Sequence, residues 1–67
     1  MKYLIKIADY YWKPGSSKEI IYKDDKGREF LGSTYNVVIG DTMIVEVGEA
    51  LEEGYYKIIK FIGLKKG

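Results

Sequence analysis

The sequence offers few groups for acid–base catalysis. It has 67 residues and contains neither His nor Cys. General acid–base catalysis usually relies on His or on a buried carboxylate pair. The only adjacent carboxylates are Asp24–Asp25 and Glu52–Glu53. Both pairs lie in segments next to glycine, where water keeps carboxylates ionised, and Asp is a preferred turn residue. We therefore expect no catalytic carboxylate pair.

Nucleophilic, metal and phosphate sites are also poorly supported. The Ser and Thr hydroxyls have no His to activate them. A chain without thiolates or imidazoles lacks the usual zinc ligands, and Asp24–Gly27 has too few oxygen ligands for a calcium loop. Lys13–Lys18 combines Gly, Ser and Lys but lacks the spacing of a phosphate-binding P-loop. The sequence therefore predicts a protein that is not an enzyme and needs no cofactor or metal.

Aromatic residues are the one excess in the composition. Ten of the 67 residues are Phe, Tyr or Trp, seven of them Tyr, and lysines are interleaved among them. Small barrels bind single-stranded nucleic acid with these residue types, because rings stack on bases and lysines contact phosphates. Tyr and Trp are also enriched in protein interfaces. A third interpretation is that the rings fill the interior of a small barrel.

The candidate binding residues are aromatic residues and the lysines beside them. They are Tyr10, Trp12, Lys13, Tyr22, Lys23, Tyr56 and Lys57. Successive side chains of a strand point to opposite faces of its sheet. Tyr10 and Trp12 can therefore share a face, whereas Tyr11 must point to the other one.

Five short apolar runs, separated by Gly, Pro and Asp, indicate the elements that must position these side chains. The runs are rich in Ile, Val, Tyr and Phe, which favour strands. In the first, Tyr3, Ile5 and Ile7 alternate with polar or small residues, as expected for a strand with one buried face. The five runs are Tyr3–Tyr11, Glu19–Lys23, Glu29–Leu31, Met43–Val47 and Tyr55–Ile62.

Turn residues separate the runs. Lys13–Ser16 contains Pro followed by Gly, which predicts a type II turn. Asp24–Gly27 predicts a hairpin loop with Gly27 in the left-handed conformation. Gly40–Asp41 predicts a further tight turn, and residues 32–36 are expected to be irregular.

The last third of the chain is ambiguous. The apolar residues of 51–62 recur at helical spacings, and Gly63 could end such a helix. Against a helix, Gly54 would lie inside it, and the Ile, Tyr and Phe of residues 55–62 favour a strand. We favour the strand.

Five strands in so short a chain predict a single all-β domain spanning residues 1–67. A flat sheet would expose one face and two edges, so we expect a strongly bent antiparallel sheet or small barrel of the SH3-like or OB-like class. The alternative is an α+β fold with a C-terminal helix at about residues 51–62.

Charge is balanced overall but uneven along the chain. The net charge is +1, which gives no general attraction to nucleic acid or to anionic lipid. Residues 41–53 carry five acids and no base, whereas residues 54–67 carry four lysines and no acid. This pattern predicts a hairpin whose arms attract each other, or a bipolar surface for a charged partner.

These observations predict a small non-catalytic binding module. We expect it to engage a protein partner, or a second copy of itself, through an exposed Tyr/Trp surface. The alternative is a small barrel that binds single-stranded DNA or RNA, although nucleic-acid binders normally carry a basic footprint. No run is long and apolar enough for a membrane span, and the absence of Cys favours the cytoplasm.

Overall fold

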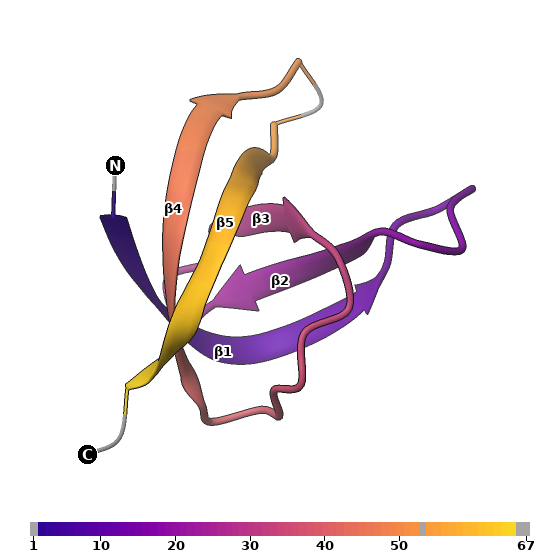
Figure 1. Cartoon of the computed structure of the whole chain (residues 1–67). Coiled ribbons are helices and arrows are strands. Elements are labelled where there is room, and N and C mark those ends of the chain that lie inside the picture. Colours follow the sequence, from indigo (N-terminus) through magenta and orange to yellow (C-terminus); the bar gives the residue numbers. More distant parts are fainter. Residues whose placement is uncertain (1, 53, 66–67) are drawn as a thin grey trace.

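The computed structural model describes residues 2–52 and 54–65, which form five strands (Figure 1). All five predicted runs are strands, with slightly different ends. Within the described residues there is no helix, so none could cross a membrane. The strands are β1 (Lys2–Trp12), β2 (Ile20–Asp24), β3 (Glu29–Gly32), β4 (Thr42–Ala50) and β5 (Tyr56–Lys65).

The five strands form a closed barrel in the order β1-β2-β3-β5-β4, and β4 pairs with β1 to complete it. The predicted all-β small barrel is therefore confirmed. The sheet was expected to be antiparallel throughout, but β3 and β5 run parallel through two residue pairs, Phe30 with Tyr56 and Leu31 with Lys57. The sheet is thus mixed, and β1 pairs with both β2 and β4.

Strand β1 has two partners. Residues 2–6 pair with β4, and residues 7–12 pair with β2. Ile7 pairs with Asp24 of β2, and Asp9 pairs with Lys23. Between these two pairs β1 advances by two residues but β2 by only one. Ala8 is therefore the extra residue of a β-bulge, which bends the strand and increases its twist. The bend allows one strand to follow both neighbours and close the barrel.

The barrel interior is filled by inward-facing side chains from all five strands. Ile5 and Ile7 are buried as their alternation predicts, and Tyr3 packs against them half-buried. Each fully buried aliphatic side chain contributes about 1.5–3 kcal/mol through removal of apolar surface from water. The buried cluster comprises Ile5, Ile7, Ile20, Tyr22, Phe30, Val37, Met43, Val45, Val47 and Ile58.

The alternative of a helix at about residues 51–62 is wrong, because β5 is a strand with two bulges. Inward-facing Ile58 and Phe61 pair with Val47 and Val45 of β4. Between these two pairs β5 advances by three residues and β4 by only two, so β5 has one extra residue, Ile59. A second shift between Phe61 and Gly63 leaves Ile62 as an extra residue. These shifts convert the two-residue period of a strand into the three-residue spacing that resembled a helix face.

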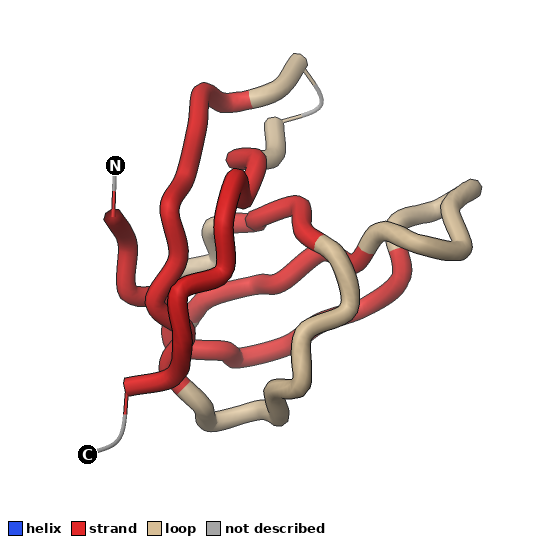
Figure 2. Tube along the Cα trace, in the orientation of Figure 1, coloured by secondary structure: helices blue, strands red, loops and turns tan. Residues whose placement is uncertain are grey.

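The predicted turns are present. Ser16 N–H donates to the Lys13 carbonyl at 3.0 Å, and Gly15 has φ 81°, as a type II turn requires. Gly27 has φ 84° in the β2–β3 loop. The long loop from β3 to β4, residues 33–41, passes β1 and β2 on its way across the molecule (Figure 2).

Asp24 anchors the β2–β3 hairpin. It is the one buried charged residue in the described part of the chain. Its Oδ1 accepts from the backbone N–H groups of Lys26 at 2.9 Å and Arg28 at 2.8 Å, and its Oδ2 accepts from Arg28 Nε at 2.6 Å. Burial alone would raise the pKa of Asp24, but these hydrogen bonds stabilise the carboxylate, and its pKa lies below the ordinary value of 3.8.

We expect Asp24→Asn to lower the free energy of unfolding at pH 7 by about 1–3 kcal/mol, because a buried charge-assisted bond is lost. The folded pKa is lowered, so the wild-type carboxylate stabilises the fold above pH 3.8, and this contribution disappears as pH falls through the folded pKa. The difference between variant and wild type should therefore shrink in urea unfolding at low pH. Asp25→Asn, at an exposed neighbour, is the control. Equal effects of the two variants at pH 7 would contradict this role for Asp24.

Candidate partner-binding groove

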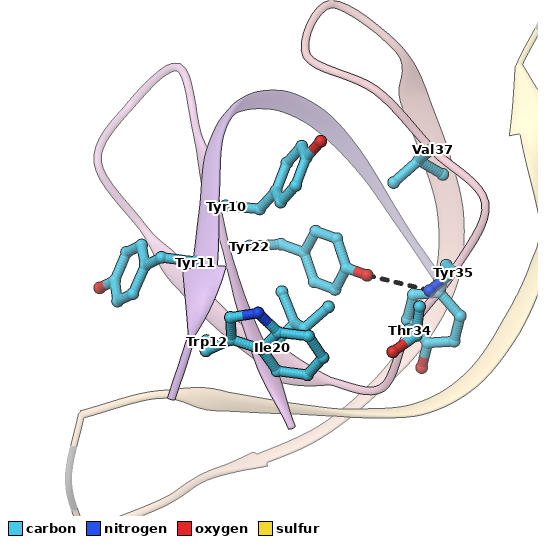
Figure 3. Close-up of a pocket in the computed structure, with 8 residues that line it drawn as sticks. All are labelled: Tyr10, Tyr11, Trp12, Ile20, Tyr22, Thr34, Tyr35 and Val37. Atoms are coloured by element: carbon cyan, nitrogen blue, oxygen red, sulfur yellow. Dashed lines mark hydrogen bonds between the residues drawn. The ribbon is translucent and has the colours of Figure 1, made fainter. Parts of the chain in front are cut away.

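A groove with a cavity volume of about 400 Å³ lies between the end of the β1–β2 ribbon and the β3–β4 loop (Figure 3). Its walls are aromatic or aliphatic, with one threonine. We call it the aromatic groove. It is lined by Tyr10, Tyr11 and Trp12 from β1, Ile20 and Tyr22 from β2, and Thr34, Tyr35 and Val37 from the loop.

Tyr10 and Trp12 are the exposed rings of the groove. They pair with Tyr22 and Ile20 across the β1–β2 ladder. Because the Ala8 bulge adds one residue, Tyr10 and Trp12 continue the inward face of β1 begun by Ile5 and Ile7. At this end the barrel has opened, so Tyr10 remains 40% exposed and Trp12 55% exposed. Tyr10 and Trp12 thus share a face of β1.

A row of stacked rings supports the groove. Tyr10 lies against Tyr22, with ring centroids 6.1 Å apart. Tyr22 stacks on Tyr35 at 5.6 Å, and Tyr35 stacks on Phe61 of β5 at 4.8 Å. Stacked aromatic pairs contribute beyond the area they bury. The exposed ring of Tyr10 therefore rests on rings fixed by the barrel core.

Tyr22 also anchors the loop wall. Its hydroxyl donates to the Ser33 carbonyl at 2.7 Å. The same hydroxyl accepts from the Tyr35 N–H at 3.1 Å (Figure 3). Burial raises the pKa of Tyr22, although the hydrogen bond from the Tyr35 backbone partly opposes this, so the hydroxyl remains neutral and able to donate. Tyr22 was a candidate contact residue, but with 1% exposure its side chain forms the floor of the groove.

Tyr11 borders the groove but points away from its interior (Figure 3). Its hydroxyl donates to the Glu29 carboxylate on the outer face of the sheet. This hydrogen bond, with smaller effects of burial and nearby charges, raises the pKa of Tyr11 to about 12. The Tyr11 hydroxyl is thus neutral and engaged outside the groove.

The other candidate residues are distributed over the barrel. Lys13 is half-buried in the turn that follows Trp12, outside the groove lining. Lys23 and Lys57 are exposed on β2 and β5, and neither lines the groove. Tyr56 is half-buried and packs on Phe30, with centroids 5.6 Å apart. The structure thus brings together Tyr10, Trp12 and Tyr22 and separates the remaining four from the groove.

Sequence reasoning missed the loop side of the groove. Residues 32–36 were expected only to be irregular, yet Thr34 and Tyr35 line the groove together with Val37. The available signal was the alternation of Tyr35 and Val37, which both pack against the barrel core. Exposed Val38 and Ile39 follow directly. A loop with this many apolar residues indicates that part of it fills the open end of a barrel.

The acidic side chains of the described residues do not gather into a metal-binding group. They contain no group of three or more Asp or Glu side chains that could hold a metal ion. Within the Asp24–Asp25 pair, Asp24 is engaged with Arg28 and Asp25 is exposed. The pair Glu52–Glu53 cannot be compared, because Glu53 lies outside the described residues.

No protein-family model, curated protein or solved structure matches the chain.

We expect Trp12→Ala to change the free energy of unfolding by less than about 1 kcal/mol, because the indole is largely exposed. Tyr22→Ala should cost about 3–5 kcal/mol, because it empties a buried site and leaves Tyr35 N–H without its acceptor. Urea unfolding of both variants checks the comparison. A loss at Trp12 as large as that at Tyr22 would make the indole part of the core.

Proposed function

We propose that this protein is a non-catalytic binding module that holds a segment of a protein partner in the aromatic groove. The observation that carries the proposal is the pair of exposed rings, Tyr10 and Trp12, above a floor of packed aromatic side chains. Protein interfaces depend on a few Tyr, Trp and Arg residues that enter well-packed pockets. Tyr10 is already packed on Tyr22, so its ring loses little side-chain entropy when a ligand binds.

The groove offers apolar area and a few hydrogen-bonding groups. Its lining contains no Asp, Glu, Lys or Arg. The Trp12 indole nitrogen, which can only donate, lies on the side of the ring toward Tyr22 (Figure 3). An uncharged segment with apolar side chains and free carbonyl groups matches this lining.

The distribution of lysines supports a protein partner over nucleic acid. Single-strand binders combine base-stacking rings with a positively charged path for the phosphates. Lys23 and Lys57 lie away from the groove, although, with Tyr10 and Trp12, they are among the candidate binding residues predicted from the sequence. Salt-dependent phosphate contacts dominate nucleic-acid affinity, and the uncharged groove lining supplies none. Nucleic-acid binding therefore stays the second hypothesis, to be decided by experiment.

The test is selection of ligands from a random dodecapeptide library on wild-type protein and on Trp12→Ala. We expect wild type to enrich peptides with apolar residues that Trp12→Ala does not retain, because removing the indole removes the main exposed ring. Synthetic versions of enriched peptides should change the Trp12 fluorescence, and Lys23→Ala, outside the groove, should leave their affinity unchanged.

The same fluorescence titration with an oligo-dT 15-mer at low salt tests the second hypothesis. We expect no change in Trp12 emission. A saturable change that weakens as salt is raised would overturn the proposal in favour of nucleic acid. Equal enrichment of peptides on wild type and Trp12→Ala would also overturn it, because the binding site would then lie elsewhere.

A further inference from the structure

The outer edge of β1 beyond its bulge is unpaired in the described structure. Residues 2–6 of β1 lie beside β4, but residues 9–12 have a partner only on the β2 side. At Ile7 the loop covers this edge, since Ile7 N–H donates to Asp41 O and Gly40 N–H donates to Ile7 O. Beyond this contact with the loop, from Asp9 to Trp12, the edge is free. Free edges are templates for pairing with another chain.

Backbone geometry shows which groups this edge presents. In an antiparallel ladder, alternate residues exchange hydrogen bonds with a given neighbour. Lys13 N–H donates to Glu19 O at 2.9 Å, so Lys13 and Tyr11 direct their N–H and C=O groups toward β2. Tyr10 and Trp12 therefore direct theirs to the open edge. Consistent with this, Tyr10 N–H donates to the side chain of Asp9, at 2.9 Å.

We propose that a second copy of this chain pairs with the open edge, so that two β1 strands lie antiparallel across a two-fold axis at Tyr11. In this register Tyr10 of each copy forms a hydrogen-bonded pair with Trp12 of the other. Both residues present backbone donors and acceptors to the edge, so the two pairs exchange hydrogen bonds reciprocally. With a two-fold axis, each copy contributes the same short edge to the interface.

Neighbouring registers use the edge less well. A shift that sets Trp12 opposite Trp12 places Tyr10 opposite Pro14, which has no N–H to donate. The opposite shift sets Trp12 against Ala8, the extra residue of the bulge. Only the register centred on Tyr11 uses both Tyr10 and Trp12 in regular pairs.

Charge and ring chemistry agree with the same register. Asp9 of one copy lies opposite Lys13 of the other, at both ends of the paired segment. Opposite charges directly across antiparallel strands stabilise the pairing. On the groove side, Tyr10 of one copy faces Trp12 of the other, and aromatic cross-strand pairs add to the stability of a sheet. Pairing requires Asp9 to release the Tyr10 N–H, and Lys13 of the other copy then compensates the carboxylate.

This inference rests on the backbone edge and goes beyond the proposed function. In the dimer the two aromatic grooves lie next to each other along one continuous sheet. Each copy still presents its own Ile20, Tyr22 and loop wall. The two proposals have separate tests: partner binding is read from peptide affinity, and dimerisation from Trp12→Val against Trp12→Pro, which both lack the indole and differ in the backbone N–H.

Sedimentation equilibrium at 10 µM to 1 mM tests the backbone pairing with two variants of one residue. Trp12→Val removes the indole and keeps the N–H, whereas Trp12→Pro removes both. The Trp12 N–H has no role in pairing with β2, and proline is tolerated on strand edges. We expect a monomer–dimer equilibrium for wild type, with dimerisation at least ~10-fold weaker for the Pro variant than for the Val variant, because two hydrogen bonds per dimer are lost.

Disulfide trapping tests the register without relying on the Pro variant. Residues 9 and 13 of opposite copies would form a non-hydrogen-bonded pair, in which Cα atoms are close enough for a disulfide. We expect Asp9→Cys and Lys13→Cys to cross-link rapidly when mixed, and each alone to cross-link slowly. A strictly monomeric wild type at 1 mM, equal dimerisation of the Val and Pro variants, or equal cross-linking of mixed and single variants would overturn the proposal.

Discussion

The structure depends on one strand that pairs with two neighbours. β1 follows β4 with its first half and β2 with its second half, and the Ala8 bulge supplies the bend between them. Without this division the five strands could not close, because β4 would have no partner at the far edge of the sheet. The extra residue also changes which side chains face inward, which places Tyr10 and Trp12 on the face that continues the core. Barrel closure and the position of the exposed rings thus have the same cause.

The same division explains why a small protein with balanced charge carries a prepared apolar groove. Beyond the bulge, β1 and β2 extend past the closed part of the barrel, and the loop at residues 33–41 covers only part of the open end. Tyr22 joins these parts, since its ring stacks on Tyr35 and its hydroxyl holds the backbone at Ser33 and Tyr35. The aromatic excess therefore has two roles. Most rings lie in the barrel core or pack against it, whereas Tyr10 and Trp12 are exposed at its open end, with Tyr10 packed on Tyr22.

Local signals in the sequence were sufficient for the strands and turns but not for their long-range arrangement. The alternation of Tyr3, Ile5 and Ile7 and the turn glycines act locally, and the structure confirms them. The strand β5 was ambiguous because bulges at Ile59 and Ile62 imitate helical spacing. The parallel pairing of β3 with β5 and the role of Tyr22 as the groove floor depend on contacts between segments far apart in sequence. Residue types near Tyr10 and Trp12 suggested a binding surface, but only the fold shows that Lys23 and Lys57 are not part of it.

The Ala8 bulge sets the orientation of β1 from Asp9 to Trp12. Amide hydrogen exchange measured by NMR at low protein concentration reports which N–H groups of this segment are bonded to β2. We expect slow exchange at the N–H groups of Tyr11 and Lys13, which face β2, and fast exchange at that of Trp12, which faces the open edge. Protection of Trp12 with fast exchange at Tyr11 and Lys13 would contradict the register, and with it the position of the aromatic groove and the free edge beside it.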